Sequence, residues 1–451
     1  MKTLLSLVCA AVALASVRTP APPHTTANLL GARSVPGQAN GDYFQAGAAA
    51  RVKAFVGARV IDGTDRPPLA NAVLIVRDGR VVEVGSLGRV NIPSDAQRVT
   101  LTGKTVIPGL VNAHGHVGNT VGTEQGHYSA ENVARDLKTY AAYGVTTVFS
   151  LGDDQAAGIT ARDGQRTPAL DHSRLFVAGP VLGPASPSDA VTQVDAVAAM
   201  GVDIVKIRVD DNLGATAKMA PAIYKAVIDE AHKKGLRVAV HLFYLEDAKA
   251  VLDAGADFIA HSVRDVPVDD GFVAMLKRRG VCYCPTLMRE VSTFVYESTP
   301  SWFSDPLFLK HADMVAVEAL KQPARQQAMA NSKSAQRYKT GLEVANRNLK
   351  TLSDAGVTIA MGTDTGPPAR FQGYFELMEL EMMAKAGLTP KQVLASATRD
   401  AAKCMKLDAE LGTLEPNKWA DFVVLDADPL ANISNVRAID AVYVAGNRVA
   451  R

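Results

Sequence analysis

The sequence predicts an α/β protein in which a (β/α)8 barrel is carried by a discontinuous β-sandwich that both ends of the chain form together. Both ends carry alternating apolar runs joined by tight turns, the middle alternates short apolar runs with helix-period segments, and ionisable residues end several of the apolar runs in the middle. The length of 451 residues agrees with this organisation. A barrel of about 250 to 300 residues plus a smaller domain is the natural expectation at this size.

The composition narrows the class of protein. Hydrophobic residues make up 47% and charged residues 21% of the chain, which is ordinary for a globular protein. The formal net charge is +2, and the sequence contains neither a block of Lys and Arg nor a basic stripe interleaved with aromatic residues. We therefore expect no nucleic-acid partner.

The first fifty residues are expected to lie outside the folded domains. Residues 1–15, MKTLLSLVCAAVALA, combine a cationic start, an apolar core and an Ala-Leu-Ala end, which is typical of a secretory signal peptide. This apolar run is too short for a membrane span. Residues 16–50 are rich in Pro, Ala, Thr and Gly and predict a flexible leader. The protein is expected to be secreted or periplasmic.

Residues 51–107 and 411–451 are expected to form the composite β-sandwich. The first segment contains VKAFVGARVIDG and NAVLIVRDGRVVEVG, in which Asp78 and Gly79 form a hairpin turn between two alternating runs. The second segment contains WADFVVLDADPL and AIDAVYVAGNRV. Neither segment has enough strands to bury a sheet face by itself, so the two are expected to fold together.

Residues 108–410 are expected to form the TIM barrel. Helix-period segments such as MAPAIYKAVIDEAHKKG and DDGFVAMLKRRG, each closed by Gly after basic residues, lie between apolar runs. A long helical stretch over residues 290–354 exceeds a normal barrel unit and is expected to form a lid or a wall of the substrate site. The predicted strands are residues 110–114, 146–151, 175–179, 203–209, 237–242, 258–262, 281–287 and 358–364.

The stretch VIPGLVNAHGHVG, residues 106–118, places His114 and His116 at the end of the first predicted barrel strand. Residues two apart on a strand project to one face, about 6 to 7 Å apart along the chain, so both imidazoles can enter one cavity. Imidazole suits Zn, Fe, Ni or Cu, whereas Mg and Ca favour oxygen ligands. The pair predicts a transition-metal site if the rest of the chain supplies further ligands.

Four further residues of this kind, Lys206, His241, His261 and Asp364, fall at the ends of predicted strands, where barrel enzymes carry their chemistry. Taken singly, a buried strand histidine is more often a satisfied core residue, and Asp364 in GTDTG could cap a turn. Lys206 lies between Val and Ile, so its side chain must lose its charge, pair with an opposite charge or be chemically modified. Taken together, the six residues favour a metal site.

The remaining histidines and cysteines are interpreted as structural. Cys282 and Cys284 would share one strand face, where packing is favoured over a metal role, and the three cysteines after the signal peptide indicate no disulfide framework. His127 is the strongest exception among the histidines in the leader, loops or helical segments. Those histidines are His24, His127, His172, His232 and His311.

The motifs PGLVNAHGHV, GTD and WADFVVLDADPL resemble those of the amidohydrolase superfamily, in particular its imidazolonepropionase-like branch, which includes dipeptidases acting on Xaa-Pro or Xaa-Arg/Lys. The resemblance covers the chain from about Val52 to the C-terminus. It implies two divalent metals, with zinc preferred, and a lysine that is carboxylated by CO2 so that its carbamate bridges them. The implied ligands are His114, His116 and Asp364 for the first metal, His241 and His261 for the second, and Lys206 between them.

Two points qualify the resemblance. Imidazolonepropionase and related deaminases work with one metal and lack that lysine role, so Lys206 argues against them. The glycine pair that often follows the lysine segment in the dipeptidases is missing from VKIRVDDNLG. This departure leaves the substrate more open than the metal site.

The resemblance implies a hydrolysis in which two metals about 3.5 to 4 Å apart hold and activate a bridging hydroxide, while Asp364 takes its proton and passes it to the leaving amine. Tyr244, three residues after His241, is a candidate hydrogen-bond donor to the developing oxyanion, with packing as the alternative. Arg208 and Arg289 are candidates for binding a substrate carboxylate, because a guanidinium matches carboxylate geometry. The alternative is that either arginine pairs with a neighbouring aspartate.

The expected function is that of a metal-dependent amidohydrolase that cleaves C–N bonds in dipeptides or N-acyl amino acids. A lactonase or phosphotriesterase is the first alternative, because the same hydroxide attacks those bonds. A non-catalytic periplasmic binding protein on this fold is the alternative of another class, and it predicts a loss of ligands that the sequence does not show. Helices outside a barrel often form subunit contacts, so the protein can form a homo-oligomer. The sequence does not determine the oligomeric state or the identity of the metal.

Overall fold

The structure of the protein is a computed structural model that describes residues 52–450. The predicted signal peptide, residues 1–15, and the predicted leader, residues 16–50, lie outside the described residues. Within residues 52–450, no helix combines the length and the apolar character that a membrane crossing requires.

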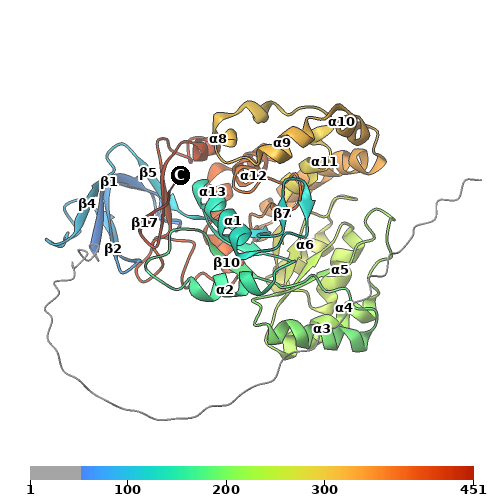
Figure 1. Ribbon diagram of the computed structural model, residues 1–451. Helices are drawn as coiled ribbons and strands as arrows, with labels where there is room; N and C mark the ends of the chain where they lie inside the picture. Colours follow the sequence, from blue (N-terminus) through green and yellow to red (C-terminus); the bar gives the residue numbers. More distant parts are fainter. Residues whose placement is uncertain (1–51, 451) are drawn as a thin grey trace, which may run out of the picture. The chain divides into compact units, whose positions relative to one another are not determined.

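Eight parallel segments close a barrel that is surrounded by helices (Figure 1). Three pairs of neighbouring segments meet through residues outside the regular strands, and the seventh and eighth segments are one of these pairs. Asp203 N donates to Val177 O at 2.9 Å between the third and fourth segments, and Ala113 N donates to Met361 O at 2.9 Å between the first and eighth segments. The regular strands are β6 (Leu110–Gly115), β9 (Val145–Ser150), β10 (Arg174–Val177), β11 (Val205–Arg208), β12 (Val238–His241), β13 (Phe258–Ala260) and β14 (Cys282–Cys284).

The eighth barrel segment differs from the prediction. A strand was expected over residues 358–364, but only Ile359 forms a bridge, to Tyr283. Tyr283 N also donates to Thr358 O at 3.1 Å, so this segment still closes the barrel. Its end leaves the strand conformation because Asp364 has a φ of 57°, which lies in the left-handed region.

Helices follow the barrel strands, as the sequence predicts. Asp269 accepts a hydrogen bond from Phe272 N at the start of α6, and Gly280, with a φ of 62°, ends this helix after basic residues. The helices outside the long insertion are α1 (Ala130–Ala142), α2 (Ala156–Gly164), α3 (Pro187–Ala199), α4 (Pro221–Lys233), α5 (Leu245–Ala254), α6 (Asp270–Arg279), α12 (Tyr374–Lys385), α13 (Pro390–Ser396), α14 (Arg399–Cys404) and the 3-10 helix η3 (Ile433–Arg437).

The predicted helical stretch over residues 290–354 is divided into several elements. It begins earlier than predicted, because α7 starts at Leu287, within the predicted seventh strand. Pro306 and Pro323 begin α8 and α10, at a position where proline is favoured. The elements are α7 (Leu287–Ser292), η1 (Val295–Glu297), η2 (Ser301–Ser304), α8 (Pro306–Leu309), α9 (Met314–Leu320), α10 (Pro323–Ala330) and α11 (Lys333–Asp354).

Strands from both ends of the chain form one eight-stranded sheet (Figure 1). β15 pairs antiparallel with β5, so that Val423 lies opposite Ile107. The sheet branches at β1, because residues before Gly57 pair with β4 and residues after it pair with β5. Gly57 has a φ of 91° at this branch, which glycine adopts readily. The strands are β1 (Val52–Val60), β2 (Leu69–Arg77), β3 (Arg80–Ser86), β4 (Gln97–Thr100), β5 (Thr105–Pro108), β15 (Phe422–Leu425), β16 (Ile439–Val444) and β17 (Asn447–Arg448), with β7 (Thr120–Val121) and β8 (Glu124–Gln125) as a separate hairpin.

The interpretation of the cysteines as unpaired is wrong. Cys282, at the start of β14, forms a disulfide with Cys404, at the end of α14. The two positions are 122 residues apart, and they meet because both belong to one buried cluster that also contains Val111 of β6. Within residues 52–450, Cys284 is the free cysteine, and it is buried.

Replacing Cys404 with serine is expected to lower the free energy of unfolding by about 2 to 5 kcal/mol, because the disulfide closes a long loop in the unfolded chain. A urea titration followed by circular dichroism measures this loss. Reductant should lower the unfolding midpoint of the wild-type protein and leave that of the variant unchanged. A wild-type midpoint that does not respond to reductant would show that this disulfide does not stabilise the fold.

Candidate metal centre

Three of the six predicted ligands meet at the carboxyl ends of neighbouring barrel segments. His114 and His116 come from the end of β6, and Asp364 ends the eighth segment, which pairs with β6. One ligand atom from each residue lies within 4.8 Å of the other two. Nε2 of His116 is 2.9 Å from Oδ1 of Asp364, and Nε2 of His114 is 3.5 Å from the same oxygen. These three side chains can therefore share one cation.

The other three predicted ligands continue the cluster. Nζ of Lys206 lies 3.3 Å from Nε2 of His114. The ring centroid of His261 is 4.6 Å from that of His114 and 4.2 Å from that of His241. Lys206 lies within β11, and His241 and His261 lie at the ends of the adjacent segments β12 and β13. The structure thus brings all six predicted ligands together, and all but the partly exposed His116 are buried.

Protein contacts determine which nitrogen of an imidazole faces the cluster. Nδ1 of His116 lies 3.1 Å from Gly152 O, which can only accept, so this nitrogen carries the hydrogen. Nε2 of His241 lies 3.1 Å from the Asp210 carboxylate and donates in the same way. The other nitrogen of each ring is then free of hydrogen in the neutral form, and this is the nitrogen that binds a metal.

His261 and Asp364 are held in unusual backbone conformations. Their φ angles are 78° and 57°, values that residues other than glycine rarely adopt. Nδ1 of His261 contacts the hydroxyl of Thr286 at 2.8 Å, and Thr286 itself has a φ of 47°. Such conformations are strained and concentrate at functional sites, where the surrounding structure fixes the direction of a side chain.

Burial lowers the pKa of most basic groups of the cluster, whereas the pKa of His116 is raised, because the lowering by burial is outweighed by its contact with the Asp364 carboxylate. Burial lowers the pKa of His241 to about 3 and the pKa of His261 well below its usual value, so both rings are neutral near pH 7. Burial also lowers the pKa of Lys206 to about 8, which raises the fraction of neutral amine that can react with CO2. Nδ1 of His114 has no hydrogen-bond partner among residues 52–450. The neutral imidazoles of His114, His241 and His261 beside a carboxylate fit a divalent transition metal.

The sequence from residue 105 to residue 449 matches the amidohydrolase family. The chain belongs to this family. It is 24% identical over 440 residues to ochratoxinase from Aspergillus niger, with 85% of this chain and 83% of that protein covered. It is 25% identical over 397 residues to imidazolonepropionase from Streptomyces coelicolor, with 80% and 88% covered. Its fold is similar to that of a Xaa-Pro dipeptidase solved with methionine in its active site, with a TM-score of 0.72 at 19% identity and with 89% of this chain and 100% of that chain covered.

Membership of the family confirms three predictions made from the sequence. These are the resemblance itself, the fold of a barrel with a β-rich domain, and a hydrolase that acts on C–N bonds. Amidohydrolases generally depend on metals, and the group of His114, His116 and Asp364 is where this amidohydrolase can hold one.

Arg208 and Tyr244, which are predicted to contact the substrate, form hydrogen bonds with Asp210 and Asp211. The side chain of Arg208 is 40% exposed, and its Nε donates to Asp210 at 2.7 Å. The hydroxyl of Tyr244 donates to Asp211 at 2.9 Å, and Nζ of Lys218 lies 4.1 Å from the centre of the Tyr244 ring. The pairing of Arg208 with a neighbouring aspartate is the alternative that the sequence left open.

Two arginines approach Asp364 instead. Arg289, which the sequence predicts as a substrate contact, is 7% exposed, and its Nε lies 3.9 Å from Oδ2 of Asp364. Arg370, which sequence reasoning missed, is 18% exposed and pairs with the same oxygen. Arg370 lies in the loop GTDTGPPARFQG. Its position six residues after Asp364 was the only signal for it, because a loop has no periodicity from which a direction follows.

Sequence reasoning also missed a buried carboxyl group, that of Glu376, which lies behind the group of His114, His116 and Asp364. Oε1 of Glu376 accepts hydrogen bonds from Nδ2 of Asn112 at 2.7 Å and from the hydroxyls of Thr363 and Thr365 at 2.5 Å each. Oδ1 of Asn112 accepts from His114 N at 3.0 Å. Glu376 therefore ties β6 to the eighth segment. In the sequence it is one of several glutamates on a helix and carries no signal of its own.

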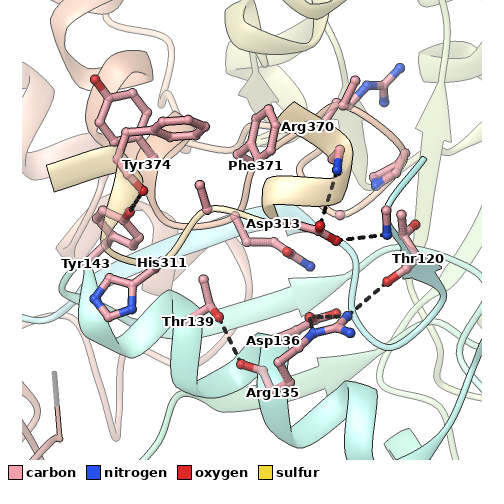
Figure 2. A pocket seen from close by; sticks show the side chains of 18 residues that line it. Thr120, Arg135, Asp136, Thr139, Tyr143, His311, Asp313, Arg370, Phe371 and Tyr374 are labelled. Carbon is pink, nitrogen blue, oxygen red and sulfur yellow. Dashed lines mark hydrogen bonds and ion pairs between the residues drawn. The ribbon is translucent and has the colours of Figure 1, made fainter. Parts of the chain in front are cut away.

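The helical segment over residues 287–354 and the loop after the eighth segment line a cavity of about 260 Å³. Figure 2 shows Tyr143, Phe371 and Tyr374 in one part of the lining and Arg135 beside Asp136 in another. Residues 308–316, in and between α8 and α9, form its third side. The helical segment over residues 287–354 thus forms part of a cavity wall, and its role as a wall of the substrate site stays a prediction.

Replacing Asp210 with asparagine is expected to weaken metal binding about 10- to 100-fold, because the ring of His241 loses the carboxylate that orients it. Competition with a chelator measures the affinity. Asp211→Asn is the matched control, since Asp211 contacts Tyr244 and none of the six ligands, and it should retain the wild-type affinity. Equal affinities in the two variants would contradict the orienting role of Asp210.

Proposed function

We propose that this amidohydrolase is a binuclear metal enzyme that hydrolyses the amide bond of dipeptides or N-acyl amino acids. The observation that carries the proposal is the convergence of four imidazoles, Lys206 and Asp364 at the carboxyl ends of the barrel strands, which is where barrel enzymes place their chemistry. The likeness to a Xaa-Pro dipeptidase supports a peptide-like substrate.

The six residues would divide between two cations. His114, His116 and Asp364 would hold the first, and His241 and His261 would hold the second. A carboxylated Lys206 would lie between the two, and zinc suits this ligand set. When bound, such metals supply a nucleophilic oxygen at neutral pH and polarise the scissile carbonyl.

The side chains of the protein would carry the proton. Asp364 accepts it from the attacking water and returns it to the nitrogen of the leaving amine. His116 and Arg370 both contact the Asp364 carboxylate, so they hold it in the position that this transfer needs. Asp210 fixes the ring of His241 in the same way.

We also propose that the enzyme acts outside the cytoplasm, as the predicted signal peptide over residues 1–15 indicates. The disulfide between Cys282 and Cys404 supports this location, because disulfides form and persist in oxidising compartments. Fractionation of bacterial cells that express the full chain tests the proposal. Protein that stays in the cytosol with residues 1–15 uncleaved would contradict it.

A substrate panel tests the proposed reaction. The metal-loaded enzyme, with bicarbonate present, is assayed on dipeptides, N-acyl amino acids, lactones and phosphotriesters. We expect the highest kcat/KM on an amide, because the relatives include a dipeptidase and imidazolonepropionase. A lactone or phosphotriester as the best substrate would replace the proposal with the alternative hydrolase, and no turnover on any member would favour a binding protein.

A further inference from the structure

Three arginines of low exposure, Arg264, Arg289 and Arg370, carry more positive charge than the carboxylates they pair with neutralise. Arg264 and Arg289 both pair with Glu290, and Arg370 pairs with Asp364. Three guanidinium groups therefore share two carboxylates, and none of these five side chains is more than 18% exposed. Unbalanced buried charge is unfavourable. The arrangement is suited to an anion that binds beside Asp364.

Arg289 has a hydrogen-bond donor left for such an anion. Its Nη1 donates to the two oxygens of Glu290 at 3.1 and 3.2 Å, and its guanidinium carbon lies 4.6 Å from the centre of the Tyr338 ring. These contacts fix the plane of the group. Within residues 52–450, its Nε has no hydrogen-bond partner, and it lies 3.9 Å from Oδ2 of Asp364. A buried N–H of this kind is a binding position for a ligand oxygen.

We propose that Arg289 and Arg370 bind the α-carboxylate of the leaving amino acid and thereby select the substrate. This inference rests on the proposed amide hydrolysis and adds the part of the substrate that the two arginines contact. Asp364 gives the proton to the leaving nitrogen in that reaction. A carboxylate held beside Asp364 therefore belongs to the amine fragment, where one carbon atom separates it from the nitrogen, and not to the acyl fragment.

This assignment changes the pair of arginines that the sequence suggested. Arg208 pairs with Asp210. Arg289, from helix α7, and Arg370, from the loop after the eighth segment, both approach the carboxylate of Asp364. A site built to pair a charged group discriminates strongly against a neutral analogue, because its own buried groups are then left without partners. Substrates with a free carboxylate on the leaving group should be preferred.

The test compares dipeptides with their C-terminal amides on the metal-loaded full chain. L-alanyl-L-proline, L-alanyl-L-methionine and L-alanyl-L-arginine are each assayed as the free acid and as the amide, and the release of alanine is followed. We expect kcat/KM to be about 100-fold higher or more for the free acid. Arg289→Met should remove most of this difference by raising KM for the acid, and Arg289→Lys should recover part of it. Arg337→Met is the matched control, since Arg337 is exposed and lies over the Phe243 ring.

Each outcome decides between the two proposals. Equal kcat/KM for acids and amides in the wild-type enzyme would overturn the carboxylate contact and leave the proposed function standing. Cleavage of neither form, together with inactivity on N-acyl amino acids, would overturn the proposed function itself. An equal loss for both forms in Arg289→Met would assign Arg289 to the positioning of Asp364 and would overturn its role as a substrate contact.

A measurement on the wild-type enzyme covers the case in which Arg289→Met does not fold. The C-terminal amino acid of the best dipeptide substrate and the amide of that same amino acid are compared as inhibitors. The acid is expected to inhibit at a concentration at least about 10-fold lower, because charge-assisted hydrogen bonds to a carboxylate are stronger than those to a neutral amide. Equal inhibition by the two compounds would overturn the inference.

Discussion

Replacing Asp364 with asparagine is expected to lower kcat by about 1000-fold, which is within the usual contribution of general acid–base catalysis. Asparagine has nearly the same shape, but it accepts no proton from the attacking water and returns none to the leaving amine. His116 and Arg370 both contact this carboxylate, so the variant also weakens the first ligand group. The test is kcat on the best amide of the panel, with the metal content measured on the same preparation.

Asp153→Asn is the matched control for this variant. Asp153 is an exposed aspartate on the loop after β9, and its φ of 65° is one that asparagine adopts without added strain. It should retain wild-type turnover, and circular dichroism should show the same fold in both variants. Wild-type turnover in Asp364→Asn would exclude the proposed proton transfer.

Replacing Lys206 with alanine is expected to lower both metal content and activity, with a loss of about 100-fold or more in kcat/KM, because even residues that only orient metal ligands contribute 10- to 100-fold. Lys206 is buried and adjacent to His114, so truncating its side chain opens space beside the ligands. Acetate or propionate should restore part of the activity by entering that space. Metal analysis and kcat/KM, each measured with and without the acid, check the prediction.

Lys225→Ala is the matched control, since Lys225 pairs with Asp229 and is 60% exposed. It should keep its metal and its activity. The same carboxylic acids should leave Asp364→Asn inactive, which separates rescue of the bridge from general activation by the acid. Unchanged activity in Lys206→Ala would remove the carbamate from the mechanism.

The order of strands and helices could be predicted because apolar periodicity and helix caps are local signals. Asp269 and Gly280 bound α6 as the sequence indicates. The eighth strand was drawn too long, because its apolar pattern does not reveal the turn that Asp364 makes. The pairing of Cys282 with Cys404 was missed because it depends on a contact between segments 122 residues apart.

By itself, the sequence determined the chemistry available to this amidohydrolase. Five coordinating residues end apolar runs and Lys206 lies within one. The carboxyl ends of parallel strands converge in any closed barrel, so topology alone brings these residues to one cavity. Only the tertiary structure decided which partners surround them. Arg370, Glu376 and Asp210 act through contacts of about 3 Å or less with residues of the site. Such partners are selected by distance in three dimensions, and the local sequence of a loop or of a helix face is the same whether or not that distance is short.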